Sequence, residues 1–268
     1  MTARKDSTLV LKDVSLRFAG VQALDGVDLR VEPRTIHSLI GPNGAGKTSC
    51  FNVISGVYKP TRGSITLGDA ELVGRLPHQI AALGVGRAFQ NIALSARQTV
   101  AQNLLLGRHV LTSSGLLSAG LRLRRSRQER AAGDEVVARI AGLLGLERHL
   151  HRSAGDLSYG DRKRLELGRA LAMEPSIVLL DEPVAGMNDD ETARTAEILR
   201  RVCADLGTAI LLIEHDMSLV MGISDHVTVL TSGRYLTSGT PAAVAADPAV
   251  QTAYTGAVHA GHESGEAL

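Results

Sequence analysis

Hydrophobic and polar residues alternate along the first part of the chain. In residues 8–32, apolar side chains recur at every second position, as in TLVLKDVSLRF and GVDLRVEP. This period is typical of half-exposed antiparallel strands. The apolar run TIHSLI at 35–40 instead predicts a buried strand, which SCFNVISGV follows as a helix. GSITLGD at 63–69 predicts a further short strand with a turn.

The pattern changes twice in the rest of the chain. From residue 76 to about 150 the spacing is helical, as in TVAQNLLLGRHV and DEVVARIAGLLGL. Beyond it, the strands SIVLLD, AILLIEHD and HVTVL alternate with helical segments, which implies a mainly parallel sheet. We therefore expect an α/β fold in a single domain, 1–255, with a helical subdomain inserted at about 91–170. The small, polar tail 256–268 is expected to be disordered.

Composition narrows the possible classes of protein. The 268 residues are 44% hydrophobic, which suffices for a sizeable core. A net charge of +1 argues against a nucleic-acid partner. No apolar run approaches the roughly 18–20 residues of a membrane span, and MTARKDSTLV lacks the apolar region of a signal peptide. Cys50 and Cys203 are far apart, which fits a reducing compartment.

An arginine-rich stretch lies inside the predicted helical subdomain. LRLRRSRQER, at 121–130, carries five arginines. It is interpreted either as a solvated face or as a surface that meets a partner protein or lipid headgroups.

Residues 41–48 match the phosphate-binding pattern G-x-x-x-x-G-K-[ST], with a strand before and a helix after. Backbone N–H groups around 44–48 are expected to surround a β-phosphate. Lys47 is expected to reach the β- and γ-phosphates, and Thr48 to bind Mg²⁺. The predicted nucleotide-binding residues of this loop are Gly41, Pro42, Asn43, Gly44, Ala45, Gly46, Lys47, Thr48 and Ser49.

Polar residues follow three other apolar stretches. Asp181 and Glu182 end the strand SIVLLD, where ligands bind in open α/β sheets. Asp181 is predicted to hold Mg²⁺ through water and Glu182 to act as general base on an attacking water. His215 follows AILLIE and is a candidate for the γ-phosphate, and Gln90 follows GVGRAF and is a candidate for Mg²⁺ or the water. Each also has a purely structural interpretation, as a solvated or packed strand end.

The order of these motifs indicates the class. The guanine-reading pattern Asn-Lys-x-Asp of GTPases does not occur. The succession GPNGAGKT, Gln90, LSYGD, IVLLDE and His215 resembles the ATP-binding-cassette (ABC) ATPases over about residues 8–255. That resemblance implies a P-loop NTPase (RecA-like) core, with an antiparallel β subdomain and an inserted helical subdomain. It also implies head-to-tail pairs of domains, each ATP lying between one P-loop and the partner's signature loop.

The resemblance assigns further roles residue by residue. Phe18 matches the aromatic residue that stacks on adenine, and Gln90 matches the Q-loop. Ser158, Gly160 and Asp161 match the signature loop. Asn188 lies in the D-loop, where many ABC proteins carry Asp.

The segments GVGRAFQN, AGMNDDET and IEHDMSLVMGISDHVTVL resemble one branch of that family, the larger ATPase subunit of branched-chain amino-acid importers (LivG-type). This implies an ATPase that energises uptake of branched-chain or other hydrophobic amino acids. The implied partners are a second ABC ATPase subunit (a paralogue or a copy), two transmembrane permeases and an extracytoplasmic binding protein. The implied location is peripheral, on the cytoplasmic face of the inner membrane. Alternatives are urea or amide import, lipopolysaccharide export, and a soluble ABC protein of DNA repair or translation.

The signature stretch LSYGD departs from the family at Asp161, where Gln is usual. Ser158 and Asp161 have capping-box spacing, so the stretch also predicts a capped helix start. A carboxylate about 4 Å from a phosphate charge costs roughly 4 kcal/mol at an effective dielectric of 20. Asp161 is therefore predicted to turn toward its own helix N-terminus or to accept from a ribose hydroxyl, and not to face the γ-phosphate.

Overall fold

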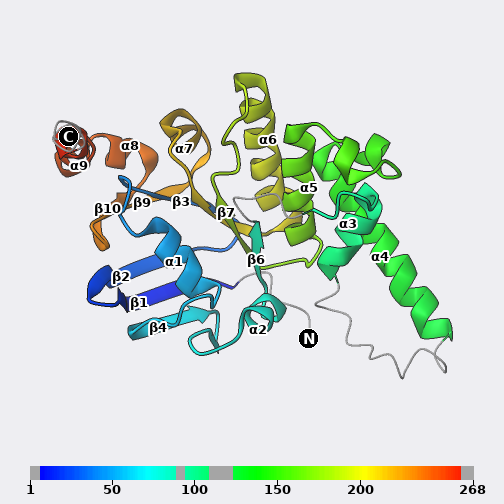
Figure 1. Ribbon diagram of the computed structural model, residues 1–268, viewed down its shortest axis with the longest axis horizontal. Helices are drawn as coiled ribbons and strands as arrows, with labels where there is room; N and C mark the ends of the chain where they lie inside the picture. The colour runs from blue at the N-terminus through cyan, green and yellow to red at the C-terminus, as the bar shows by residue number, and fades with distance from the viewer. Residues whose placement is uncertain (1–6, 89–93, 109–122, 261–268) are drawn as a thin grey trace, which may run out of the picture.

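A computed structural model describes residues 7–88, 94–108 and 123–260 of the chain. Gln90 and the first two residues of the arginine-rich stretch lie outside these ranges. The described strands form two sheets (Figure 1). In the part of the chain that the structure describes, no helix combines the length and apolarity that crossing a membrane requires.

The small sheet is antiparallel and has the strand order β2-β1-β4-β5. Its strands are β1 (Leu9–Phe18), β2 (Val21–Val31), β4 (Arg62–Leu67) and β5 (Ala70–Glu71). One face packs on the core and the other is solvated, which explains the period-2 pattern of residues 8–32. The predicted antiparallel strands are confirmed.

The large sheet has the order β10-β9-β3-β8-β7-β6 and is parallel, except that β10 runs antiparallel to β9. Its strands are β3 (Ile36–Ile40), β6 (Val85–Ala88), β7 (Ile177–Asp181), β8 (Ala209–Ile213), β9 (His226–Thr231) and β10 (Arg234–Gly239). Every residue of β3, β7 and β8 is buried, because both faces of the sheet are covered. The expected parallel α/β core is confirmed.

Helices cover the large sheet and extend one end of the molecule. They are α1 (Lys47–Ile54), α2 (Pro77–Ala82), α3 (Val100–Gly107), α4 (Leu123–Leu144), α5 (Tyr159–Leu171), α6 (Asp189–Leu206), α7 (Met217–Ile223), α8 (Pro241–Ala245) and α9 (Pro248–Ala260). Short 3₁₀ helices cover Glu147–His149 and Ala154–Asp156. In Figure 1, α3, α4 and α5 gather at the end opposite the small sheet. They lie between β6 and β7 in the sequence, where the helical insert is expected.

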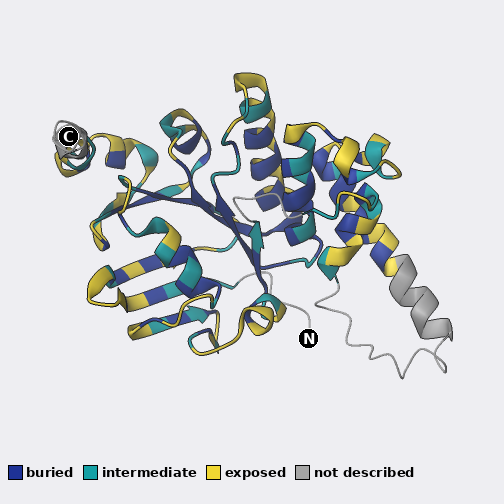
Figure 2. Cartoon of the chain, in the orientation of Figure 1, coloured by how far each residue is buried: buried dark blue, intermediate teal, exposed yellow. Residues whose placement is uncertain are grey.

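The two faces of the large sheet belong to different hydrophobic cores. Val178 and Leu180 of β7 face the core that includes residues of α3 to α7. Leu179 and Leu211 face the other core, which contains the small sheet and Phe51 of α1. In Figure 2, the strands of the large sheet are coloured as buried along most of their length.

Two expectations need correction. The helical spacing of 76–150 is interrupted by β6, a four-residue strand that pairs with β7, because a run this short carries too little periodicity to reveal a strand. The second correction concerns the tail, which is expected to be disordered from residue 256. In the structure, α9 continues to Ala260. Alanine is the strongest helix former, so small residues there extend a helix. Residues 261–268 lie outside the described ranges.

Candidate functional site

The P-loop joins the end of β3 to the start of α1. Gly41 has φ 147°, and a Cβ there would lie 2.1 Å from the carbonyl oxygen of Leu230, so this position excludes a side chain. The Lys47 Nζ donates to the carbonyl oxygens of Gly41 (2.7 Å) and Pro42 (3.0 Å). Burial lowers the pKa of Lys47, against the attraction of Glu182 and Asp181. The loop therefore wraps around its own lysine and presents the N-terminus of α1.

Asp181 and Glu182 lie at the carboxyl end of β7. Asp181 is buried, and burial raises its pKa although the Arg87 guanidinium opposes the shift. Arg87 is itself fixed, since its Nη1 donates to Asn52 Oδ1 (2.8 Å) and Ser55 Oγ (2.7 Å). The Asp181 carboxylate and the Thr48 hydroxyl are oxygen ligands of the kind that Mg²⁺ prefers, so the residues present fit this ion.

Glu182 is partly buried and has φ 50°, in the left-handed region that is unusual for a residue with a side chain. The strand order β3-β8-β7 explains its neighbours, because parallel strands end at the same edge. The loops after these strands carry the P-loop, His215 and Glu182. Tertiary structure thus assembles three predicted site segments at one edge of the sheet.

His215 lies beside Glu182. Its Nδ1 is 3.7 Å from Glu182 Oε1 and 3.8 Å from Glu214 Oε2. The imidazole is 71% exposed, whereas the side chain of Glu214 is fully enclosed. Sequence reasoning missed Glu214, although a carboxylate at the end of the apolar run AILLIE was a visible signal.

The predicted signature residues lie at the start of α5. The Ser158 Oγ accepts from the backbone N–H of Asp161 (3.1 Å), so the predicted helix cap is present. The Asp161 carboxylate, however, pairs with Arg164 one turn later. The expectation that it turns back to its helix N-terminus is therefore wrong, because a guanidinium three residues ahead is a stronger partner for a carboxylate than a backbone N–H.

Contacts of α5 run to the loop that follows β7. The Tyr159 hydroxyl donates to the Ala185 carbonyl (3.3 Å), and a Cβ on Gly160 would lie 2.9 Å from Glu191 Oε1. The Lys163 Nζ donates to the Glu182 carbonyl oxygen (3.0 Å). Lys163, which sequence reasoning did not identify, therefore links the signature helix to the backbone of the predicted base.

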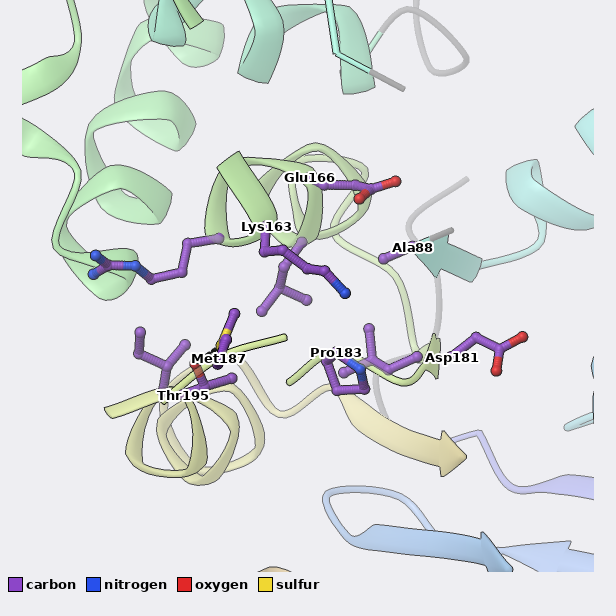
Figure 3. A pocket seen from close by; sticks show the side chains of 11 residues that line it. Ala88, Lys163, Glu166, Asp181, Pro183, Met187 and Thr195 are labelled. Atoms are coloured by element: carbon purple, nitrogen blue, oxygen red, sulfur yellow. Dashed lines mark hydrogen bonds between the residues drawn. The ribbon is translucent and has the colours of Figure 1, made fainter. Parts of the chain in front are cut away.

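A cavity separates α5 and α6 beside this contact (Figure 3). Met187 and Thr195 line it from the α6 side. In Figure 3, Lys163 reaches from α5 toward the segment that carries Asp181 and Pro183. Lys163 shares the wall of this cavity with other polar residues, among them Glu166 and Asp181, and with apolar ones such as Leu167 and Leu180.

Phe18 lies at the tip of the β1–β2 hairpin. Its ring packs edge-on against Tyr58, with centroids 4.9 Å apart and an interplanar angle of 74°. Phe18 as a whole remains 40% exposed. The hairpin borders the P-loop, since a Cβ on Gly46 would lie 2.7 Å from the Ala23 carbonyl oxygen. This placement agrees with contact to a nucleobase.

Comparison with known proteins gives the sequence two family matches. Residues 24–185 match the family described as ABC transporter, and residues 236–260 match the branched-chain amino acid ATP-binding cassette transporter family. The chain is 43% identical over 248 residues to the high-affinity branched-chain amino acid transport ATP-binding protein LivG of Escherichia coli strain K12, covering 92% of this chain and 97% of that protein. With BraF of Pseudomonas aeruginosa, which carries the same description, identity is 40% over the same shares.

Solved structures of ATP-binding cassettes have the same fold as this chain. The ADP conformation of MJ1267, an ATP-binding cassette of an ABC transporter, superimposes with a TM-score of 0.80 at 29% identity. The match covers 93% of this chain and 99% of that one. CbiO1 from Clostridium perfringens shares the fold, with a TM-score of 0.77 at 23% identity and shares of 97% and 99%.

Proposed function

Because the chain belongs to the ABC transporter family of ATP-binding cassettes, we propose that it is the ATP-hydrolysing subunit of a branched-chain amino-acid importer. The observation that carries the proposal is the meeting of the P-loop, Glu182 and His215 at one sheet edge. The match of residues 236–260 to the branched-chain family supports the choice of branch.

The chain's own residues perform hydrolysis as follows. N–H groups of the P-loop and Lys47 bind the β- and γ-phosphates of ATP, and Phe18 stacks on adenine. Glu182 takes a proton from a water whose oxygen attacks the γ-phosphorus. The bond from that phosphorus to the bridging oxygen breaks, leaving ADP and phosphate. His215 holds the γ-phosphate, and Gln90 contacts the water.

Thr48 and Asp181 would hold Mg²⁺, with Gln90 as a further ligand, and the ion neutralises charge on the β- and γ-phosphates when bound. Ser158 and Gly160 would meet ATP held by a second ABC ATPase subunit, a paralogue or a copy of this chain. The pairing of Asp161 with Arg164 supports the prediction that its carboxylate does not face that phosphate. Two permeases and an extracytoplasmic binding protein complete the importer, with this chain peripheral on the cytoplasmic face of the inner membrane.

The first test is Glu182→Gln in the assembled transporter. ATP turnover should fall by about 10²–10⁴-fold, because a general base is removed while shape is kept. ATP affinity, measured by equilibrium titration, should be retained. Glu197→Gln, at an exposed position of α6, is the matched control and should turn over ATP normally. Equal turnover in Glu182→Gln and wild type would refute the assignment.

The transported solute is tested separately. Vesicles containing the full complex should accumulate labelled leucine, isoleucine or valine when ATP is inside. Uptake of urea or an aliphatic amide instead would replace the branched-chain proposal with a related importer. ATP-driven release of lipopolysaccharide from the membrane would identify an exporter.

A further inference from the structure

Glu214 is a buried carboxylate at the end of an apolar strand. It follows β8 directly, and its side chain has no exposed surface. Burying a carboxylate costs free energy unless hydrogen bonds compensate. The strand residues before it, Ala209–Ile213, are all apolar and buried. An apolar residue at position 214 would therefore satisfy the packing equally well.

The Glu214 carboxylate joins two loops of the site. Oε1 accepts from the backbone N–H of Val184 (3.1 Å), in the loop after β7. Oε2 accepts from the backbone N–H of His215 (3.1 Å), in the loop after β8. Burial raises the pKa of Glu214, and these bonds, together with one from the Asp216 backbone, oppose the shift. One side chain thus ties together the segments that carry Glu182 and His215.

The loop after β7 needs such a restraint. The left-handed φ of Glu182 is unfavourable for a residue with a side chain, so the surrounding structure must hold this conformation. Lys163 holds the Glu182 carbonyl oxygen from the α5 side. Glu214 holds the Val184 N–H from the β8 side. The backbone on both sides of Pro183 is therefore fixed by a buried charged group.

The same carboxylate also faces the imidazole. His215 Nδ1 lies 3.7 Å from Glu182 Oε1 and 3.8 Å from Glu214 Oε2. Glu214 therefore lies close to the side chain of His215 as well as accepting from its backbone N–H.

We propose that Glu214 is a positioning residue that holds Glu182 and His215 in the geometry required for ATP hydrolysis. The proposal rests on the proposed function, because it assigns to Glu182 the role of base. Glu214 acts through these two residues and does not itself contact ATP. Its loss should therefore lower kcat and leave nucleotide affinity unchanged.

The test is Glu214→Gln in the assembled transporter. The amide keeps the shape, but its NH₂ group replaces one of the two acceptor oxygens and faces a backbone N–H donor, so one loop is released. A displacement of about 1 Å at a catalytic group costs up to about 10²-fold in rate. We expect kcat to fall by about 10- to 100-fold, while the ATP dissociation constant stays within about twofold of wild type. Wild-type kcat in the folded variant would overturn the proposal.

Thr208→Val is the matched control. Thr208 is buried and precedes β8, and its Oγ1 donates to the Pro175 carbonyl (3.0 Å), which precedes β7. It therefore bridges the same two strands at their opposite ends. The control should keep wild-type kcat. An equal loss in Thr208→Val would show that any buried bridge has this effect, and would overturn the proposal.

Glu214→Asp provides the second variant, since it keeps the carboxylate but withdraws it by one methylene. It should also lose kcat at constant ATP affinity; a parallel loss of affinity would overturn the proposal. Glu182→Gln, measured alongside, separates the two hypotheses. If Glu182→Gln loses turnover and the Glu214 variants do not, only the positioning role of Glu214 is refuted. If Glu182→Gln keeps wild-type turnover, the proposed function, in which Glu182 is the general base, is refuted.

Discussion

His37 is a single buried residue that makes the stability of the protein depend on pH. It lies in β3, and its Nε2 is 2.8 Å from Thr228 Oγ1 in the neighbouring strand. Its ring is 5.0 Å from that of His226. Burial, and to a smaller extent repulsion by His226, lowers the pKa of His37 from 6.5 to about 3. The folded protein therefore holds this imidazole neutral where the unfolded chain binds a proton.

His37 should make the protein sensitive to acid. Because the pKa is lower in the folded state, the contribution to stability is complete above pH 6.5 and is lost as the pH falls toward 3. Between pH 7 and pH 5 this linkage amounts to about 2 kcal/mol. His37→Gln should reduce the loss of unfolding free energy over that interval by a similar amount, measured by urea denaturation. His151→Gln, at an exposed position, is the control; an unchanged pH dependence in His37→Gln would contradict the prediction.

At the scale of elements, the caps of α5 and α6 shape the segments predicted to be the signature loop and the D-loop. Asn188 caps α6: its Oδ1 accepts from the Glu191 N–H (2.9 Å), and Glu191 Oε2 accepts from the Asn188 N–H (3.2 Å). The departure from the family's usual Asp therefore preserves the capping chemistry, since Asn and Asp are nearly equivalent caps. The Glu191 side chain also lies against Gly160, so the capping residues of α6 contact the first turn of α5.

The cap predicts how substitutions at Asn188 differ. Asn188→Ala should lower the unfolding free energy by about 1 kcal/mol, because an N–H of α6 loses its acceptor. Asn188→Asp retains an acceptor and should stay near wild type. Equilibrium urea denaturation of both variants provides the comparison. Equal destabilisation by Ala and Asp would show that the side-chain cap contributes nothing.

At the scale of the whole molecule, the C-terminal helix reaches the P-loop. Tyr254 of α9 packs against the cluster that contains Ile40 and Val229. The Gly41 backbone N–H donates to its hydroxyl, and burial raises the pKa of this phenol. The segment that matches the branched-chain family, 236–260, is thereby connected to the first residue of the nucleotide loop.

Tyr254→Phe should weaken ATP binding. It removes one hydrogen bond worth about 1 kcal/mol, so the dissociation constant should rise by up to about fivefold if the P-loop relaxes. Calorimetric titration with ATP measures this change. Tyr235→Phe loses a hydroxyl whose partner is Ser238 in β10 (3.0 Å), and it should bind ATP as wild type does. Identical affinities of the two variants would refute the link between α9 and the P-loop.

Local patterns were sufficient for much of the fold and for the contiguous motifs. The P-loop is predictable because eight consecutive residues contain its chemistry. Asp181, Glu182 and His215 are predictable as strand ends, since parallel strands finish at one edge. Two-residue alternation and buried apolar runs likewise distinguish the two sheets, because burial imposes those periods directly.

Only the tertiary structure decided which partners these residues have. The pairing of Asp161 with Arg164, the reach of Lys163 to Glu182 and the bridge from Glu214 to Val184 depend on rotamers and on segments far apart in the chain. The docking of Tyr254 at Gly41 spans more than two hundred residues. Sequence alone determined what chemistry was available at each strand end. Packing determined which groups hold it in place, because sequence periodicity records burial but not the identity of the neighbour.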